Sequence, residues 1–403
     1  MPRLPNTQTI IMGCDPELFL SKEVGIVKKR RSIVGSELVV PEGCGPYTMV
    51  VRDGVQVELH PGTSHCRANL SNTIQATFRT LRDILTKHEG VHPDFRQVVT
   101  LTPGELAKLT PRSRELGCQP SKNLYNRPHI QRDGSKFRQR SAAGHIHISC
   151  TVPLEPSRLV ALMDVFVGNT MVLVDRDPLA AARRKTYGRA GEYRVKSAFH
   201  IEYRTLSNFW LHNYKLMSLA FGLARVATMV HIAKAAEEYY RRNKYPDYKN
   251  TYWIDAEQEI MHGVDLSKFE TAINTNDFDL ALENYNKVVR PAFEKIGVCE
   301  YGLNVSLLSR FDTFVRKIRE AELAGKTENR EYLRVWFPED PVQHWLTKPE
   351  GHGTGWENWL GANVQPTLPT VSGVIAVPTT PKETMIVPAP PTIIRDIGKE
   401  LPF

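Results

Sequence analysis

Four short segments of this 403-residue chain combine acidic, histidine and arginine residues with apolar residues in the alternation typical of β-strands. They are Gly13–Glu17, Asp53–Glu58, Gly144–His147 and Ile201–Arg204. Alternate side chains of a strand point to the same face, so each segment predicts polar groups side by side. Carboxylates and imidazoles bind divalent cations, and guanidinium groups bind phosphates. The four segments together predict the inner face of a sheet that holds metal ions and a nucleotide.

The first two segments supply carboxylates. Asp15 and Glu17 are two residues apart, and two acids on one strand face are costly to bury unless a cation lies between them. Glu58 ends an alternating run that follows the turn signal Asp53–Gly54. Metal binding is the prediction for these acids. The alternatives are an edge strand with solvated acids, which Pro16 favours, and an ordinary hairpin with a polar outer face.

The last two segments combine imidazole, carboxylate and guanidinium groups. His145 and His147 share a strand face, where one ring can bind a metal while the other contacts a nucleotide phosphate. Glu202 and Arg204 also share a face. This pair predicts a metal ligand beside a phosphate ligand, because magnesium is usually held by carboxylates and substrate phosphates together. The alternatives are two exposed histidines and a simple ion pair.

A basic segment with two glycines, residues 183–196, precedes the last of these strands. We expect a loop that closes over a polyphosphate and neutralises charge in the transition state. Its candidate phosphate contacts are Arg184, Lys185, Arg189, Arg194 and Lys196. The alternative is a mobile basic loop without a ligand. The chain contains neither a GxxxxGK[ST] nor a GxGxxG nucleotide motif.

The elements that must position these residues are strands first and helices later. Strands are expected at residues 9–20, 48–60, 141–150 and 200–206. Helices are expected at residues 70–88, 157–174 and 211–242, with three or four more between 255 and 325. This order predicts an α+β domain in which helices pack on one face of an antiparallel sheet. We assign residues 1–335 to this catalytic domain.

The C-terminal residues 336–403 differ in composition from the rest of the chain. Prolines recur through a stretch of low charge, which predicts an extended tail or a strap over the domain. Trp356 and Trp359 are expected to anchor its start.

Composition limits the partners. The net charge is +8, but basic residues are scattered and only Lys28–Arg31 forms a tight run, so nucleic-acid binding is not expected. The apolar stretch Leu216–Ala233 is interrupted by charge and is shorter than a membrane span, and the N-terminus lacks a signal peptide. Six cysteines form no CxxC pair, which is typical of free thiols in a reducing cytoplasm.

The ordered motifs resemble those of the glutamine synthetase and glutamate–cysteine ligase superfamily. Cys14–Leu20 resembles its Glu-Pro-Glu-Phe-Phe strand, with an aspartate for the first glutamate. Ala143–Ser149 resembles its Gly-Met-His-Val-His strand, and Ile201–Arg204 its Ile-Glu-Val-Arg strand. The set is similar above all to phage-type COOH–NH2 ligases (amidoligases), which share the Asp-Pro-Glu, Asp-Gly…Glu-Leu and Gly-His-Ile-His motifs. The resemblance covers about residues 9–235.

The resemblance implies a fold and a role for each matching residue. The fold would be a curved antiparallel β-sheet around a funnel-like active site, with helices on its outer face. Glu17 and Glu58 would hold the metal nearer the substrate. The second metal, nearer ATP, would be held by Asp15, His145 and Glu202. His147 would touch the nucleotide, and Arg204, Arg189 and Arg194 would handle phosphates, beside Arg184 and Lys196 from the basic segment.

Two features depart from the family pattern. Glutamine synthetase has a small β-grasp domain before its first acidic strand, whereas twelve residues precede Gly13 here, so the shorter ligase branch is expected. The amidoligase branch is expected to carry Gly-Cys-Asp-Pro, but residues 117–121 read Gly-Cys-Gln-Pro-Ser and lack the acid. Substrate contacts in that segment are therefore not carried over.

The expected activity is an ATP- and Mg²⁺-dependent ligase, with Mn²⁺ as the alternative cation, that joins a small-molecule or peptide carboxylate to an amine through an acyl phosphate. We expect it in the cytoplasm, of a host cell if a phage encodes it, and leave open a homo-oligomer. One alternative is a phosphagen-kinase-like phosphotransferase, which shares the sheet architecture. Another is a non-catalytic binding or virion-associated protein, favoured by the positive charge and the proline-rich tail but disfavoured by the aligned acids.

Overall fold

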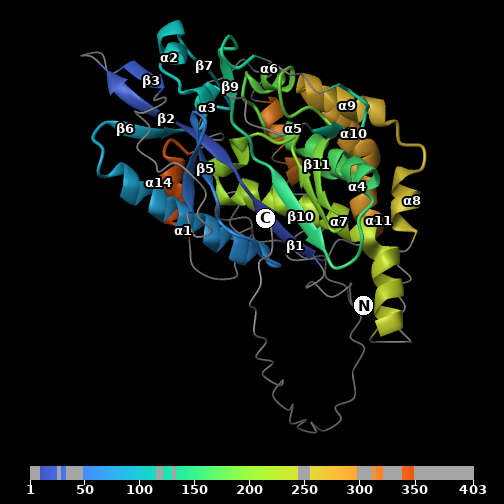
Figure 1. The fold of residues 1–403 in the computed structure, drawn as a ribbon. Helices are drawn as coiled ribbons and strands as arrows, with labels where there is room; N and C mark the ends of the chain where they lie inside the picture. The colour runs from blue at the N-terminus through green and yellow to red at the C-terminus, as the bar shows by residue number, and fades with distance from the viewer. Residues whose placement is uncertain are drawn as a thin grey trace, which may run out of the picture. The chain divides into compact units, whose positions relative to one another are not determined.

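The computed structural model describes residues 10–24, 29–32, 49–114, 121–128, 133–243, 255–296, 311–313, 315–320 and 338–348. All of them belong to one compact unit, residues 1–360. Figure 1 shows its strands and helices in chain order.

The strands are β1 (Ile10–Cys14), β2 (Glu17–Val24), β3 (Lys29–Ser32), β4 (Val50–Asp53), β5 (Gln56–Leu59), β6 (Val91–Asp94), β7 (Val98–Thr100), β8 (Lys122–Asn123), β9 (Gln139–Ser141), β10 (Ile146–Cys150), β11 (Glu192–Ser197) and β12 (His200–Tyr203). The helices before β11 are α1 (Arg67–Leu85), α2 (Pro103–Ala107), α3 (Pro111–Arg114), α4 (Pro156–Met163), the π-helical η3 (Asp164–Gly168), α5 (Asn169–Val172) and α6 (Ala180–Arg184). Those after β12 are η4 (Asn208–His212), α7 (Tyr214–Asn243), α8 (Ala256–Met261), α9 (Leu266–Thr275), α10 (Phe278–Asn284), η5 (Tyr285–Val289), α11 (Arg290–Ile296) and α14 (Pro341–Leu346).

The described strands pair antiparallel in separate groups. One five-stranded sheet has the order β1-β10-β12-β11-β8, and a second has the order β3-β2-β5-β4 with β6 also paired to β2. β7 and β9 form a two-stranded ribbon. Antiparallel sheets with helices that follow confirm the predicted α+β class.

The predicted strand at residues 9–20 is two strands that belong to different sheets. β1 pairs with β10, whereas β2 pairs with β5. The change occurs at Asp15–Pro16, where proline cannot donate to a ladder but its carbonyl accepts from the Leu59 N–H at 2.9 Å. Asp15 and Glu17 therefore lie on either side of a junction instead of on one regular strand face.

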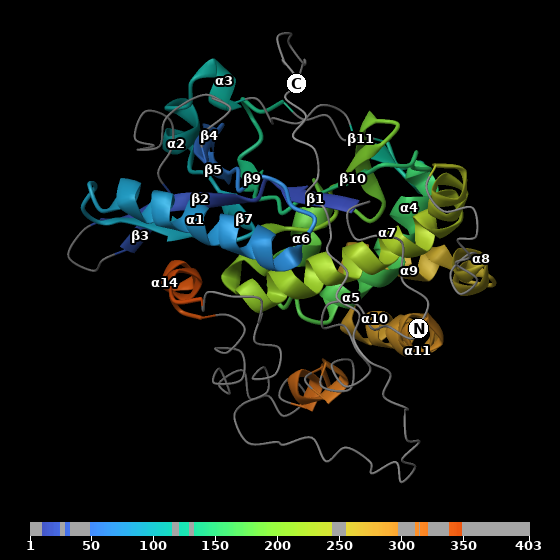
Figure 2. The ribbon, with the colours of Figure 1, turned by 90° about the horizontal axis from the view of Figure 1, so that it is seen from below.

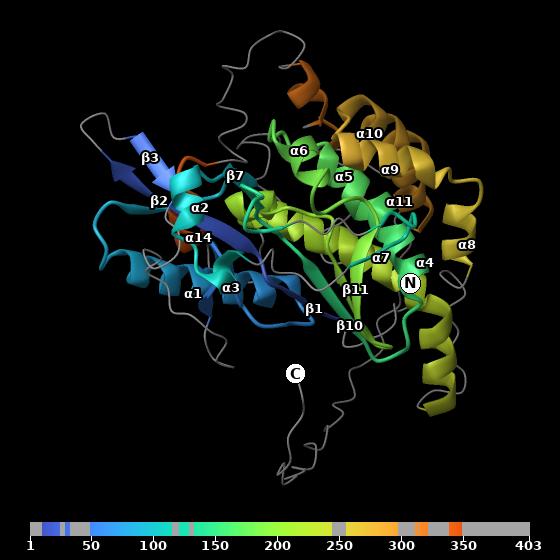
Figure 3. The same ribbon diagram turned by 45° about the horizontal axis from the view of Figure 1, so that its top comes forward.

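Helices cover one face of the β1-β10-β12-β11 sheet. Ile146, Ile148, Ile201 and Tyr203 are buried on this face, where α4 and α7 lie. Figures 2 and 3 show α7 running across the sheet on one side of its strands. The alternating residues His147 and Glu202 therefore face the opposite side, away from the helices.

The predicted helix at residues 157–174 is continuous but locally widened. α4 passes into the π-helical turn η3 and then into α5. The first residue of the turn, Asp164, is fully buried and accepts hydrogen bonds from the hydroxyls of Tyr203 at 2.7 Å and Tyr125 at 2.8 Å. This network joins the helix layer to β12, the strand that carries Glu202.

The helix predicted at residues 211–242 is α7, Tyr214–Asn243. It extends beyond the apolar stretch Leu216–Ala233 at both ends. Residues Tyr214–Glu238 are long and apolar enough to cross a membrane by length and composition alone, but 94% of the apolar window is buried inside the fold. A core helix passes the same test, and α7 packs against α4, α1 and the sheet.

The basic segment 183–196 is only partly a loop. Arg183 and Arg184 end α6, and residues from Glu192 onward form β11, so the connection is confined to residues 185–191. The prediction of one loop was wrong because its glycines, Gly188 and Gly191, both at φ +70°, bend a short connection between two regular elements.

Helix α14 lies within the range predicted to be an extended tail. Asp340 caps it by accepting from the Gln343 N–H, and Pro341 occupies its first turn. Trp345 is fully buried, stacks on Phe78 and donates its indole N–H to the Leu211 carbonyl. One tryptophan thus anchors this segment to α1. Trp356, Trp359 and the rest of the predicted tail lie outside the described residues.

Candidate active site

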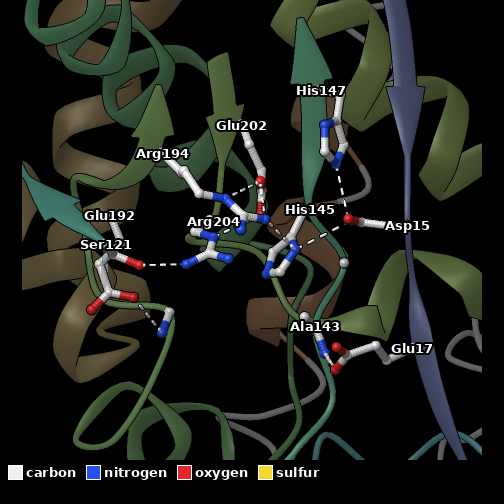
Figure 4. Close-up of polar contacts among 12 residues, drawn as sticks. Asp15, Glu17, Ser121, Ala143, His145, His147, Glu192, Arg194, Glu202 and Arg204 are labelled. Atoms are coloured by element: carbon white, nitrogen blue, oxygen red, sulfur yellow. Dashed lines mark hydrogen bonds and ion pairs between the residues drawn. The ribbon is translucent and has the colours of Figure 1, made fainter. Parts of the chain in front are cut away.

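The side of the β1-β10-β12-β11 sheet that faces away from the helices carries a row of residues in register across four strands. Gly13 of β1 pairs with His147 of β10, His147 pairs with Glu202 of β12, and Glu202 pairs with Arg194 of β11. Side chains of paired residues lie on the same face of a sheet. The register therefore brings three of the predicted site residues together, as Figure 4 shows.

Asp15 extends this row into a cluster of acids and imidazoles. Its carboxylate lies 2.9 Å from His147 Nε2 and 3.2 Å from His145 Nδ1. The same His145 nitrogen lies 3.3 Å from a Glu202 oxygen. His145 therefore lies between two carboxylates that come from either side of β10, Asp15 beyond the end of β1 and Glu202 on β12 (Figure 4).

Gly144 explains how His145 reaches this position. A Cβ at residue 144 would lie 2.2 Å from the Ser207 carbonyl oxygen, so only glycine allows the two chain segments to approach. The glycine at position 144 is therefore required by this approach. Its carbonyl accepts from the Trp210 indole N–H at 3.1 Å, which fixes the backbone just before the histidine.

Positively charged side chains surround the Glu202 carboxylate on the other side of the row. Arg204 Nε donates to one oxygen at 2.7 Å, and Arg194 Nε donates to the other at 2.7 Å. Lys196 Nζ lies 3.5 Å away. The side chain of Arg204 is 0% exposed, against 22% for Arg194 and 37% for Lys196, so the last two are the cations that a solvent-borne phosphate reaches first.

Arg204 also bonds outside the row. Its Nη1 donates to Ser121 Oγ at 2.7 Å. Ser121 directly follows residues 115–120, which lie outside the described residues. The segment that departs from the family pattern therefore ends at the site, with a hydroxyl on the buried arginine.

These charges set the ionisation of the acids. Burial raises the pKa of Glu202, but His145 and Arg204 lower it more, and the result is a pKa of about 2. Burial likewise raises the pKa of Asp15, and the neighbouring His147 and His145 outweigh it and hold that pKa well below its usual range. Both carboxylates are therefore anionic at neutral pH.

A second group of acids lies on the other sheet. Glu17 of β2 pairs in register with Glu58 of β5, and Asp53 lies at the β4–β5 turn. Glu17 accepts from the Ala143 N–H at 2.8 Å and from the Gln56 amide at 3.2 Å. Burial and then the charges of Asp53 and Glu58 raise the pKa of Glu17 well above its usual range.

One residue predicted to bind phosphate, Arg184, lies elsewhere. Arg184 is buried, and its guanidinium donates to the Ile273 carbonyl at 2.7 Å and to Asn276 Oδ1 at 3.0 Å. These contacts hold α6 against α9 and do not include the residues of the row. Arg189 lies in the connection 185–191, and its carbonyl accepts from the Thr205 hydroxyl.

Sequence reasoning missed three residues that contact the cluster. The Tyr187 hydroxyl lies 2.6 Å from His145 Nε2, His200 Nε2 lies 3.2 Å from His147 Nδ1, and Ser121 bonds Arg204. Nothing in their local sequence marks Tyr187 or Ser121. His200 could have been found, because it lies two residues before Glu202 and shares its strand face.

The described residues fit a divalent cation at Asp15, His147 and Glu202. One ligand atom of each lies within 4.8 Å of the others. Asp15 Oδ1 and His147 Nε2 are buried and make no hydrogen bond among the described residues, although each lies at ion-pair distance from a neighbour. Polar atoms in this state are ones that a cation would satisfy. Each Glu202 oxygen accepts from an arginine, so a cation at this site would share the carboxylate with Arg194 and Arg204.

Similarity to a known family is found in the same part of the chain. Residues 124–286 match the family described as phage phiEco32-like COOH.NH2 ligase-type 2. The matched range contains His145, His147, Arg194, Glu202 and Arg204, and it excludes Asp15, Glu17 and Glu58. No curated protein matches the chain. The match supports the resemblance to the amidoligases that the motifs indicated.

Proposed function

We propose that this protein is an ATP-dependent carboxylate–amine ligase. The observation that carries the proposal is the cross-strand row, which places Glu202 between Asp15 and His147 on one side and Arg194 on the other. The family similarity of residues 124–286 supports the ligase class. A site of this kind positions a polyphosphate and neutralises its charge, which is the main task of a phosphoryl-transfer enzyme.

The geometry divides the proposed roles. Asp15, His147 and Glu202 would hold a magnesium or manganese ion, which would screen the charge of the ATP phosphates when bound. Arg194 and Lys196 would contact the phosphates, because they are the exposed cations of the row. Arg204 is buried and bonded to Glu202, so we assign it to holding that carboxylate. This assignment differs from the phosphate contact that the motif implied.

The second acid group would lie toward the substrate. Glu17 lies with Glu58 and Asp53 in a group where burial, and then repulsion among the acids, raises the pKa of Glu17, and a second cation would relieve this repulsion. The glutamine synthetase-like funnel and the placement of ATP at one end are parts of this same proposal. The carboxylate would be a small molecule or a peptide.

The proposed reaction has two steps. An oxygen of the substrate carboxylate attacks the γ-phosphorus of ATP, the bond to the β-phosphate oxygen breaks, and ADP and an acyl phosphate form. The amine nitrogen then attacks the acyl carbon, the C–O bond to phosphate breaks, and inorganic phosphate leaves with the electron pair while the nitrogen loses a proton to water. The products are an amide, ADP and phosphate.

Asp15→Asn tests the proposal better than a change at Glu202, whose neutralisation would leave two arginines without their carboxylate. The assay measures ADP release and product mass with a panel of amino acids, short peptides and amines. We expect Asp15→Asn to lower ADP release at least ~100-fold, in the range of lost metal or charge-stabilising groups. Asp83→Asn is the matched control, because Asp83 is an exposed aspartate of α1.

The product decides between the ligase and its alternatives. An amide mass that requires both substrates supports the proposal. A phosphorylated amine or guanidine would instead show a phosphotransferase. Unchanged ADP release in Asp15→Asn, or steeply salt-sensitive DNA binding without any ATP turnover, would contradict the assignment.

A further inference from the structure

One side chain outside the predicted set contacts His145 directly. Tyr187, in the connection between α6 and β11, places its hydroxyl 2.6 Å from His145 Nε2. The other ring nitrogen, Nδ1, lies 3.2 Å from Asp15 and 3.3 Å from Glu202. Both nitrogens of this buried ring are therefore engaged, one by a hydroxyl and one by two carboxylates.

The two contacts together hold the ring in one orientation. Carboxylate oxygens accept hydrogen bonds, so Nδ1 carries a proton that faces them. The Tyr187 hydroxyl can donate to Nε2 of a neutral ring or accept from Nε2–H of a charged ring, so it is the partner of Nε2 in both states. Without the hydroxyl, the buried Nε2 would lose this partner, and the ring would lose the contact that fixes its orientation.

Arg183 contacts Tyr187 and the two chain segments that carry His145 and Arg204. It is 1% exposed, and its guanidinium donates to the carbonyls of Ala142 at 3.1 Å, Thr205 at 3.1 Å and Leu206 at 3.0 Å. Ala142 lies three residues before His145, and Thr205 follows Arg204 directly. The same guanidinium lies 5.4 Å from the centre of the Tyr187 ring.

Gly188 shows that the connection is shaped around this arginine. Its φ is +70°, and a Cβ there would lie 2.1 Å from Arg183 Nη1. Its N–H donates to Glu192 Oε2 at 2.9 Å, which ties the turn to the start of β11. Tyr187 therefore projects from a turn whose two ends are fixed.

We propose that Tyr187 and Arg183 are positioning residues, in which Tyr187 fixes the ring of His145 and Arg183 fixes Tyr187 together with the two segments that carry His145 and Arg204. His145, so held, keeps Asp15 and Glu202 at the separation that a cation between them and His147 requires. This proposal rests on the proposed function, because it concerns the same site. It gives the 185–191 connection a role in positioning His145. This role differs from the predicted closure of the segment over a phosphate.

Tyr187→Phe tests the proposal because it removes one oxygen and keeps the ring against Arg183. The first readout is the side-chain ¹⁵N–¹H spectrum of the metal-free protein labelled at histidine, with His145 assigned by comparison with His145→Gln. We expect one set of ring ¹⁵N shifts for His145 in the wild type and a mixture or a changed set in Tyr187→Phe. Tyr193→Phe is the matched control, since Tyr193 is a buried tyrosine of β11 that faces away from Arg194.

The second readout is a titration with Mn²⁺ alone. Residues that orient metal ligands typically change metal affinity about 10- to 100-fold, and we expect a loss in this range for Tyr187→Phe and none for Tyr193→Phe. Gly188→Ala, which must displace Arg183 without removing its charge, is expected to alter the His145 signals in the same way. Arg67→Lys serves as the control for disturbing a buried arginine, because Arg67 bonds Ser218 on α7.

The two readouts separate this proposal from the proposed function. Unchanged His145 signals in Tyr187→Phe would overturn the positioning role, whatever the titration shows. A wild type that binds no Mn²⁺ but shows the expected change in His145 would support the positioning role and contradict the metal site. Melting curves identify any variant that has unfolded, and Tyr187→Phe then decides alone.

Discussion

Asp15 and Glu17 are separated in sequence only by Pro16, but they belong to two groups of acids with opposite electrostatic surroundings. Asp15 and Glu202 lie among two imidazoles and two guanidinium groups, which hold their pKa values low. The pKa of Glu17 is raised, first by burial and then by Asp53 and Glu58. The change of sheet at Asp15–Pro16 sends these neighbours into the two groups.

The difference teaches how each group can bind a cation. In the first group the fold itself supplies positive charge, and a cation would join an existing network in which Asp15 forms ion pairs with His145 and His147. In the second group, stabilisation of Glu17 would come from the cation itself. We therefore expect the first group to keep its shape without metal and the second to depend on metal for its ionisation.

The largest effect is expected at Glu202. Glu202→Gln removes the charge that pairs with the buried Arg204 and with Arg194. Loss of one partner of a buried ion pair costs about 3–5 kcal/mol, so we expect the free energy of unfolding to fall by that amount in urea titrations. Glu155→Gln, at an exposed pair with Arg158, should change it by less than about 1 kcal/mol. Equal effects in the two variants would remove the contrast between a built network and a surface pair.

A smaller effect is expected at Arg184. The sequence predicted that this residue contacts phosphate, but it packs α6 against α9. Arg184→Gln should lower the free energy of unfolding by about 1–3 kcal/mol, because the Ile273 carbonyl and Asn276 lose their donor. Its affinity for a non-hydrolysable ATP analogue should equal that of the wild type. Arg194→Gln should instead lower the affinity for the ATP analogue and leave the free energy of unfolding close to that of the wild type. Loss of nucleotide affinity in Arg184→Gln would restore the sequence-based assignment.

The smallest effect is expected at Glu17 and depends on pH. Because its folded pKa is raised, the folded state binds more protons than the unfolded state above about pH 4.5, and stability falls as the pH rises toward the folded pKa. Glu17→Gln should therefore be more stable than the metal-free wild type at neutral pH.

Unfolding curves at several pH values check this expectation. The advantage of Glu17→Gln should shrink as the pH falls toward 4.5, and added Mg²⁺ or Mn²⁺ should stabilise the wild type more than the variant. A variant that is less stable than the wild type at every pH would show that Glu17 is stabilised by its hydrogen bonds from Ala143 and Gln56 instead of strained by its neighbours.

Short-range patterns predicted much of the fold and the main row of the site. Alternation identified the strands around His147 and Glu202, and the three- and four-residue spacing identified α1 and α7. Residues two apart on a strand share a face whatever the topology, which is why Glu202 and Arg204 were correctly placed together. The proximity of Asp15 to His145 and Glu202 followed from the resemblance and not from any local signal.

Long-range contacts could not be predicted in the same way. Proline at position 16 signalled an irregularity, but the exchange of one sheet for another depends on which strands are available to pair. Arg184 and Arg194 are the same residue type ten positions apart, and only the packing of α6 against α9 separates their roles. Tyr187 reaches His145 across 42 residues of sequence, through a turn shaped by the buried Arg183.

The most direct test of the central claim is the melting temperature of the wild type and Asp15→Asn with Mn²⁺ and a non-hydrolysable ATP analogue. A ligand that binds only the native state raises the melting temperature by mass action. The account predicts a rise of several degrees in the wild type and in Asp83→Asn, and little or none in Asp15→Asn. A rise of the same size in Asp15→Asn, or no rise in the wild type, would contradict a metal–nucleotide site at this row.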